Sequence, residues 1–255
     1  MRVVSFNANG LRSAERKGFF RWFSRQKADV LCVQELKAHA HQIDDRAFHV
    51  RGFERYLHCA EKPGYSGVAL YTRREPLRVL TGYGNPEFDA EGRYVEVELD
   101  DMIVASAYFP SGSSSEERQR AKFRFLPTFE AHMRDRLAGD KPYMVCGDVN
   151  IAHKPVDLKN WRSNQKNSGF TPEERAWMDH LIDDVGFVDA FRAVDERPDQ
   201  YTWWSNRGRA WEKNVGWRID YQLVTPSLGE RVQAASIYKR KRFSDHAPLI
   251  IDYAD

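Results

Sequence analysis

Tyr143-Met144-Val145-Cys146-Gly147-Asp148-Val149-Asn150 is an apolar run, too short for a helix, that ends abruptly in Gly-Asp-x-Asn. The apolar part predicts a buried strand. Gly147 predicts a backbone turn, and Asp148 and Asn150, two positions apart, would project to one side of an extended chain. Ligands of open α/β folds collect at the carboxyl ends of strands, so this pair is a candidate for chemistry. An Asx turn explains the motif alone equally well.

The segments around this stretch predict a mixed α/β architecture. A strand over 3–7, a helix with Phe19, Phe20 and Phe23 on one face, and a strand over 30–33 suggest a parallel crossover unit. Residues 93–99 and 102–108 flank Asp100-Asp101 as an antiparallel hairpin would. The remaining predicted strands are 67–71, 216–224 and 249–253, and the remaining predicted helices are 116–136 and the segment after the Thr171 capping box.

Length and composition bound the class of protein. The 255 residues allow one large domain or two small ones, and we expect one, because the linker-like stretch Pro110 to Ser115 is too short to separate domains. Apolar residues make up 42% and charged residues 30%, which describes a globular protein rather than a disordered one. The formal net charge of +2 is too small to indicate a nucleic-acid partner, so such a partner must be argued from local clusters.

The cysteines and the apolar runs predict a cytosolic protein. Cys32, Cys59 and Cys146 fit neither a paired disulfide framework nor a zinc site, and Cys32 and Cys146 are most simply small core residues in a reducing compartment. The chain opens without a charged-then-apolar leader, and no apolar run approaches the ~20 residues that span a bilayer.

Polar residues recur where the apolar strands end. Four predicted strands end in Asn7, Glu35, Tyr108 and the Asp148/Asn150 pair, Asp220 lies within a fifth, and Asp245-His246 precedes a sixth. Each has a plain explanation alone: Glu35 as a helix-start charge, Tyr108 as a core aromatic, His246 as a loop histidine with its hydrogen bonds satisfied. Together they supply oxygen ligands for a hard cation, a group that handles a proton and neutral donors for phosphoryl oxygens.

Seven motifs occur in order along essentially the entire chain: Phe6-Asn7-Ala8-Asn9-Gly10-Leu11, Val33-Gln34-Glu35-Leu36-Lys37, Gly67-Val68-Ala69, Tyr108-Phe109-Pro110, Gly147-Asp148-Val149-Asn150, Gly216-Trp217-Arg218-Ile219-Asp220-Tyr221 and Ser244-Asp245-His246-Ala247-Pro248. In this order they resemble the exonuclease III class of apurinic/apyrimidinic endonucleases, within the endonuclease/exonuclease/phosphatase superfamily, and especially its bacterial abasic endonucleases. One such motif would be weak evidence, but seven in order make coincidence implausible.

The resemblance implies a single domain over residues 1–255. Its fold would be an α/β four-layer sandwich of two mixed β-sheets packed face to face, with helices outside and a metal site at one edge. By resemblance Glu35 is the principal ligand of Mg²⁺ or Mn²⁺, with Asn7, Asn9 and Asp245 nearby directly or through water.

The resemblance also implies catalytic roles. Asp220 would orient His246, which contacts the scissile phosphate or a proton on it. Asp148 would activate the attacking water, Asn150 would hold that water or stabilise the phosphorane, and Tyr108 would donate to a phosphoryl oxygen. Whether Asp148 or His246 accepts the proton stays open. The products would be a 3′-hydroxyl and a 5′ sugar-phosphate end.

A third implied set contacts DNA. Trp203, Trp217 and Ile219 match positions that wall a slot for a bare sugar, although without the resemblance these tryptophans would be read as core aromatics. Asn164 and Asn167 match phosphate-contacting or flipped-site positions, Arg207 and Ser113 lie in loops that insert into DNA in relatives and vary in the family, and Lys37 is the last residue of the Glu35 motif. Basic clusters such as 239–242 then favour a DNA-tracking rim over a plain solvated surface.

The leading hypothesis is therefore a divalent-metal-dependent nuclease that acts on duplex DNA with abasic sites or blocked 3′ ends, as a monomer, in the bacterial cytoplasm near the nucleoid and without a membrane partner. The first alternative is an enzyme that is mainly a 3′–5′ exonuclease or 3′-phosphodiesterase. The second is a non-catalytic nucleic-acid-binding relative. A phosphatase of inositol phosphates or phospholipids is disfavoured, since Trp203, Trp217, Asn164 and Asn167 would then lack a purpose. The metal count and repair partners stay open.

Overall fold

The computed structural model describes residues 1–254, which form two six-stranded sheets packed face to face. The first sheet has the order β13 (Val232–Ile237), β14 (Leu249–Tyr253), β1 (Arg2–Asn7), β2 (Val30–Gln34), β4 (Val68–Thr72) and β3 (Glu54–His58). The second has the order β5 (Arg78–Thr81), β6 (Tyr94–Glu98), β7 (Ile103–Tyr108), β8 (Tyr143–Asp148), β12 (Asp220–Val224) and β9 (Val188–Asp189). A separate two-stranded ribbon pairs β10 (Trp203–Trp204) with β11 (Gly216–Trp217).

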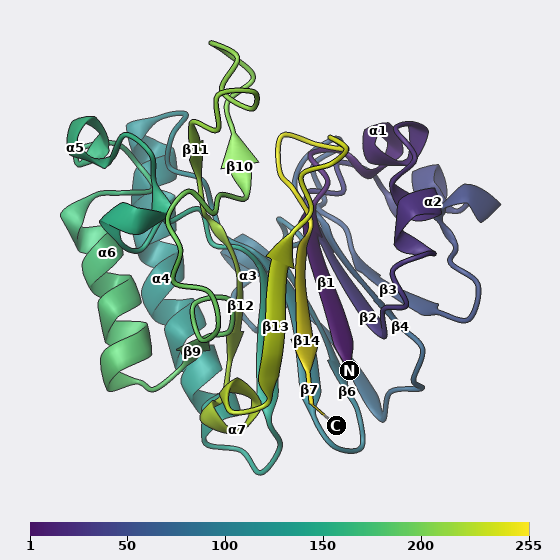
Figure 1. Ribbon diagram of the computed structural model, residues 1–255. Helices are drawn as coiled ribbons and strands as arrows, with labels where there is room; N and C mark the ends of the chain where they lie inside the picture. The colour runs from purple at the N-terminus through teal and green to yellow at the C-terminus, as the bar shows by residue number, and fades with distance from the viewer. Residues whose placement is uncertain (255) are drawn as a thin grey trace.

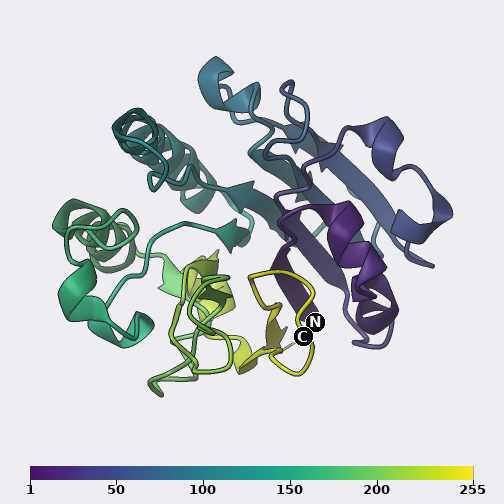
Figure 2. The same cartoon turned by 90° about the horizontal axis from the view of Figure 1, so that it is seen from above.

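Helices cover the outer face of each sheet, which gives four layers (Figures 1 and 2). The first sheet carries α1 (Leu11–Arg16), α2 (Phe19–Phe23), η1 (Ala40–Ile43) and η2 (Arg46–Phe48). The long α4 (Glu116–Leu137) and α6 (Pro172–Asp179), which continues as the π-helix η4 (His180–Asp184), cover the second. Short helices complete the chain: α3 (Pro86–Asp89), η3 (Pro155–Asp157), α5 (Trp161–Asn164) and α7 (Pro226–Gly229). The predicted four-layer α/β sandwich is confirmed.

The alternation of side chains along the central strands builds this layering. In β8, Met144 and Cys146 lie in the core cluster between the sheets, whereas Tyr143 and Val145 face the cluster under α4 and α6. Each central strand is covered on both faces, so it is apolar throughout rather than alternately polar. Cys32 and Cys146 are free thiols in the inter-sheet cluster, as predicted for small core residues.

Two local predictions hold and three need correction. β1 and β2 pair in parallel, and β6 and β7 form the antiparallel hairpin. The helix expected between β1 and β2 is divided into α1 and α2, because Gly18 between them takes φ 87°. The strand predicted over 216–224 is likewise broken, into β11 in the ribbon and β12 in the second sheet.

The third correction concerns Gly147, which is not a turn residue. It lies inside β8, and a Cβ atom there would be 1.8 Å from the Ala107 carbonyl oxygen of β7. Glycine is required by this close approach of two backbones. The left-handed turn follows at Asn150, with φ 57°.

Buried polar side chains join the two sheets across their common core. The Gln222 amide donates to the Val3 carbonyl at 3.2 Å and its oxygen accepts from the Tyr253 hydroxyl at 2.8 Å. The Gln34 amide donates to the Ser106 hydroxyl at 3.0 Å. These contacts fix how one sheet lies on the other. Within residues 1–254 no helix is long and apolar enough to cross a membrane.

Candidate active site

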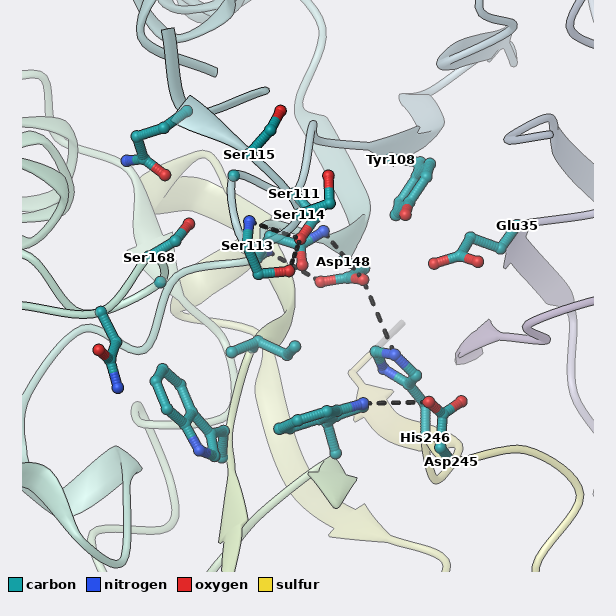
Figure 3. Close-up of a pocket in the computed structure, with 18 of the residues that line it drawn as sticks. Glu35, Tyr108, Ser111, Ser113, Ser114, Ser115, Asp148, Ser168, Asp245 and His246 are labelled. Atoms are coloured by element: carbon teal, nitrogen blue, oxygen red, sulfur yellow. Dashed lines mark hydrogen bonds and ion pairs between the residues drawn. The ribbon is translucent and has the colours of Figure 1, made fainter. Parts of the chain in front are cut away.

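The predicted site residues meet in a pocket of about 890 Å³ at the end of the sandwich opposite the chain termini (Figures 1 and 3). The first sheet supplies residues after β2 and before β14, and the second supplies residues at the ends of β7 and β8. Twelve predicted residues line the pocket: Glu35, Lys37, Tyr108, Ser113, Asp148, Asn150, Asn167, Trp203, Trp217, Ile219, Asp245 and His246. The pocket therefore lies on the seam between the sheets.

Asn7 links the two sheets beneath this pocket. Its fully buried amide nitrogen donates to Asp148 at 2.9 Å and to Glu35 at 3.2 Å. Asp148 also accepts from the Asn150 backbone at 2.8 Å and from the Asn150 amide at 3.2 Å. Asn7 is thus a positioning group behind the pocket, holding two carboxylates that come from different sheets.

His246 lies between two carboxylates. Its Nδ1 is 2.9 Å from Asp220 Oδ2. Its Nε2 is 3.9 Å from Asp148 Oδ2 (Figure 3). Ligand atoms of Asp148, Asp220 and His246 all lie within 4.8 Å of one another. The Asp220 contact fixes the ring so that Nε2 faces Asp148 and the pocket.

Burial and neighbouring charge shift the pKa values of this group. Burial, reinforced by the Asp220 carboxylate, raises the pKa of Asp148 to about 8. Burial lowers the pKa of His246, but the charge and hydrogen bond of Asp220 outweigh it and raise that pKa to about 10. Burial and the nearby Glu35 and Asp148 carboxylates raise the pKa of Tyr108 well above its usual value. At neutral pH and without a bound cation the site therefore contains an imidazolium, a protonated phenol and a largely protonated Asp148 carboxyl group.

The predicted metal set forms a connected group beside Asp148. Lys37 Nζ is 2.8 Å from Glu35 Oε2 and also donates to Asn9 Oδ1, while Asn9 donates to Asp245 at 2.8 Å. Burial raises the pKa of Glu35, but Lys37 and the Tyr108 hydroxyl outweigh it and lower that pKa. Lys37, predicted among the DNA-contacting residues, lies inside this group and also lines the pocket.

The donor set fits a hard divalent cation. Three carboxyl groups, from Glu35, Asp148 and Asp245, line the pocket, and that of Asp220 lies behind it. Among residues 1–254, Lys37 and His246 are the basic groups in direct contact with them. Asp220 Oδ1 is buried without a hydrogen-bond partner among the described residues. Carboxylate and amide oxygens are the ligands that Mg²⁺ and Mn²⁺ prefer, and the excess negative charge favours a bound cation.

The backbone of the site is strained. Of the nine non-glycine residues with positive φ in residues 1–254, five belong to the site: Asn9, Glu35, Lys37, Ser66 and Asn150. Such conformations cost on the order of 1–3 kcal/mol each and persist only where the surrounding structure holds them. Backbone hydrogen bonds between the loops provide that support: the Gly10 N–H donates to the Glu35 carbonyl at 2.8 Å, and the Lys37 N–H donates to the Ser66 carbonyl at 2.9 Å.

An apolar wall faces the charged side of the pocket. Trp203 and Trp217 pair across the ribbon with their ring centroids 6.3 Å apart and nearly perpendicular, and Ile219 packs beside them. The Trp203 indole donates to Asp245 at 3.2 Å, which ties the wall to the acidic group. The predicted slot residues therefore do lie together.

Two predicted DNA-contacting residues are outside the pocket lining. Asn164 contacts the lining residue Asn167: its side-chain oxygen accepts a hydrogen bond from the Asn167 amide at 2.7 Å. Arg207 belongs to the loop between β10 and β11, which projects beyond the end of the sandwich (Figure 1).

Sequence reasoning missed part of the lining. The missed residues are mainly hydroxyl-bearing or small: Tyr65, Ser66, Ser111, Gly112, Ser114, Ser115, Ser168, Gly169 and Thr171. The residues alone predict a loop for the serine run, and the resemblance places only Ser113 of that run among the DNA-contacting residues. The position of the run directly after Tyr108-Phe109-Pro110 was the signal that could have placed it at the site.

Comparisons with known proteins agree with this geometry. The model of the Endonuclease/Exonuclease/phosphatase family matches residues 4–246. An exodeoxyribonuclease of Bacillus subtilis is 38% identical over 98% of both chains, and the DNA repair nuclease APEX1 of Danio rerio is 36% identical over 98% of this chain and 81% of its own. The solved structure of an AP endonuclease from Archaeoglobus fulgidus has a TM-score of 0.90 at 26% identity, covering 99% of each chain. The chain belongs to the endonuclease/exonuclease/phosphatase family.

Proposed function

We propose that this protein is a divalent-cation-dependent DNA repair nuclease of the exonuclease III type, which cleaves the phosphodiester on the 5′ side of an abasic site in duplex DNA. The products are a 3′-hydroxyl and a 5′-deoxyribose phosphate. One observation carries the proposal: the acid–base pair of Asp148 and His246 and the apolar wall of Trp217 and Ile219 line the same pocket. The names of the relatives support this reading.

Asp148 takes the role of proton acceptor from the attacking water. His246, whose pKa is raised to about 10 by Asp220 against the effect of burial, is already protonated at neutral pH and serves as the cation that faces the phosphate. Its fixed contact to Asp220 orients the imidazolium. Asp148, whose pKa is raised to about 8, loses its proton more readily than His246, and a bound cation would lower the Asp148 pKa further, so this division favours Asp148 as the base.

Neutral donors would handle the charge on the phosphoryl oxygens. Tyr108 keeps its proton, because burial holds its pKa high, and it can donate to an oxygen of the phosphate. The Asn150 amide, held by Asp148 and by the Phe109 carbonyl at 3.0 Å, is placed to hold the water or to stabilise the phosphorane.

Glu35 and Asp245 would hold Mg²⁺ or Mn²⁺, with Asn7 and Asn9 positioning these two carboxylates through hydrogen bonds. When bound, the cation supplies positive charge that neutralises phosphoryl oxygens and lowers the pKa of nearby water.

Abasic specificity follows from shape. A slot walled by Trp203, Trp217 and Ile219 admits a bare sugar and excludes one that carries a base, and the missing base makes extrusion from the stack less costly. Asn164, Asn167, Ser113 and Arg207 lie on the rim or on loops beside it and would contact the backbone of the strand.

The same proposal includes duplex DNA with abasic sites or blocked 3′ ends as the partner, a monomer as the working form, and the bacterial cytoplasm as the location. Two free thiols in one core cluster suit a reducing compartment.

The deciding experiment is a gel assay on a duplex with a single tetrahydrofuran abasic mimic. With Mg²⁺ we expect one cut on the 5′ side of the mimic, lost with a chelator and restored by Mg²⁺ or Mn²⁺. A folded protein that leaves this duplex intact with either metal refutes the proposal.

A mainly 3′–5′ exonuclease is the second candidate, supported by the exodeoxyribonuclease name of the 38% identical relative. Recessed and 3′-blocked duplexes in the same assay separate the two. Faster loss of 3′ nucleotides than cutting at the mimic would favour the exonuclease.

A further inference from the structure

A fully buried ion pair lies behind the pocket and is not part of the chemistry described so far. It joins Lys122 of α4 to Glu174 of α6, with Nζ 2.7 Å from Oε1 and both side chains 0% exposed. The two residues are 52 positions apart in the chain. Each occupies a helix that covers the outer face of the second sheet.

The Glu174 carboxylate accepts four hydrogen bonds. Its Oε1 accepts from Lys122 at 2.7 Å and from the Gln119 amide at 3.0 Å. Its Oε2 accepts from the backbone nitrogens of Gly169 at 2.7 Å and Thr171 at 3.0 Å. Every partner is a donor, so only an ionised carboxylate satisfies all of them; a carboxamide would turn two N–H groups toward other donors.

The Lys122 ammonium extends this network to the catalytic turn. It donates to the Asn150 carbonyl at 2.7 Å, on the one residue of that turn in the left-handed conformation. Gly169 packs on the same carbonyl: a Cβ at Gly169 would lie 3.0 Å from the Asn150 oxygen and 3.2 Å from the Trp217 ring. The pair therefore holds together the Asn150 turn, the loop over 167–171 and the apolar wall.

Stability alone is a poor reason for such a pair. Removing two charges from water costs several kcal/mol per ion, and apolar residues of similar volume often replace a buried pair with no loss of stability. What apolar residues cannot do is hold a backbone carbonyl and two backbone amides at fixed positions. Those groups belong to the two loops that flank the pocket.

We propose that Lys122 and Glu174 are a positioning pair for the reaction assigned above. Lys122 fixes the position of the turn that carries the Asn150 amide. Glu174 fixes the position of the loop that carries Asn167 and packs on Trp217. Together they fix the catalytic turn relative to the loop that contacts the strand. This role rests on the proposed function.

The test compares the double variant Lys122→Met/Glu174→Leu with the isosteric Glu174→Gln. Glu174→Gln leaves a buried ammonium without its counter-charge, so we expect both a lower melting temperature and a lower kcat. The double variant removes both charges, so its melting temperature should lie above that of Glu174→Gln, but below the original because the Asn150 carbonyl and the Gly169 and Thr171 amides lose their partners. Its kcat on the tetrahydrofuran duplex should stay about 10- to 100-fold low, with KM changed about 3-fold or less, since misplacement by about 1 Å costs rate rather than binding.

The matched control is Arg136→Met/Glu96→Leu. Arg136 lies on the same helix, 14 residues and therefore about 21 Å beyond Lys122, and pairs with the buried Glu96. This variant should keep its kcat. A folded Lys122/Glu174 double variant with unchanged kcat overturns the proposal, and so does an equal fall of kcat in the control.

A second readout does not depend on cleavage. Hydrogen exchange at the amides of Gly169 and Thr171 should be slow in the original protein and at least ten-fold faster in both Glu174 variants, with the amides of β8 unchanged. Unchanged exchange at both amides overturns the pair's role in the loop. If the original protein cuts nothing, the proposed function fails, and the exchange measurement still judges the pair.

Discussion

Asp148 receives three hydrogen bonds from two asparagines and faces an imidazolium, yet burial and Asp220 raise its pKa. A carboxyl group with a pKa near the working pH can both accept and release a proton efficiently. At the residue scale, burial raises the pKa of Asp148 and the donated hydrogen bonds lower it, and the balance decides whether this carboxyl group can take up a proton.

Asp148→Asn and Glu35→Ala test the proposed roles of Asp148 as the base and Glu35 as a metal ligand. We expect Asp148→Asn to lower the cleavage rate by about 10²–10⁴-fold, since it removes a base, and Glu35→Ala to lower it comparably with partial rescue by high Mg²⁺. Binding to the uncut abasic duplex in chelator, measured by fluorescence anisotropy, should change only a few-fold. Equal losses of binding and cleavage would show that both residues are structural.

The raised pKa of His246 predicts how stability depends on pH without added metal. A group whose pKa is higher in the folded protein stabilises the fold fully below its unfolded pKa, here about 6.5, and that stabilisation is lost as the pH rises through the folded pKa of about 10. The melting temperature in chelator should therefore fall between pH 6.5 and 10. His246→Gln should flatten this fall, whereas His49→Gln, at an exposed position, should not.

At the scale of elements, β8 shows what a pattern of residues can and cannot predict. Apolar runs ending in polar residues correctly located the strand ends, because burial on both faces leaves a strong signal in the sequence. The prediction that Gly147 forms a turn was wrong. Glycine is needed there because the backbone of Ala107 lies close to it, and this contact depends on which strand pairs with β8. Lys122 and Glu174 were missed for a similar reason: alone, each is a helix charge.

Gly147→Ala should therefore be strongly destabilising. The added Cβ would meet the Ala107 carbonyl oxygen at 1.8 Å, and this backbone atom can move only if the β7–β8 pair separates. We expect a loss of about 3 kcal/mol or more in urea unfolding, at the upper end of overpacking costs. Gly139→Ala, where the nearest contact is an ordinary 3.4 Å, should change stability by less than about 0.5 kcal/mol.

At the scale of the whole molecule, the site exists only where the two sheets are docked. Asn7, Glu35 and Asp245 come from one sheet and its loops, and Tyr108 and Asp148 come from the other. Their convergence could be inferred only from the resemblance, because no local pattern encodes how two sheets pack. The roles given to these residues stay predictions until the variants are measured.

Tyr253→Phe isolates one contact of that docking. It leaves the buried Gln222 oxygen without its donor, which should cost about 1–3 kcal/mol in urea unfolding. Tyr253 lies at the end of β14 away from the pocket, so kcat should not change under folding conditions (Figure 1). A matched Tyr238→Phe, at a partly buried ring stacked on Phe243, should have little effect on either. A fall in kcat without a loss of stability would contradict this separation of docking from catalysis.

The five left-handed residues around the pocket also bear on how this sequence would respond to selection. Glycine adopts their backbone conformation without the steric cost, and at Ser66 it would also remove a buried hydroxyl that has no partner among the described residues. A library screened only for heat resistance should therefore enrich glycine at positions 35, 37, 66 and 150. Two of these changes, at Glu35 and Asn150, remove a side chain of the proposed metal or catalytic set, so the most heat-resistant clones would include inactive ones. At these positions selection for stability would favour glycine, whereas selection for cleavage would keep the present residues.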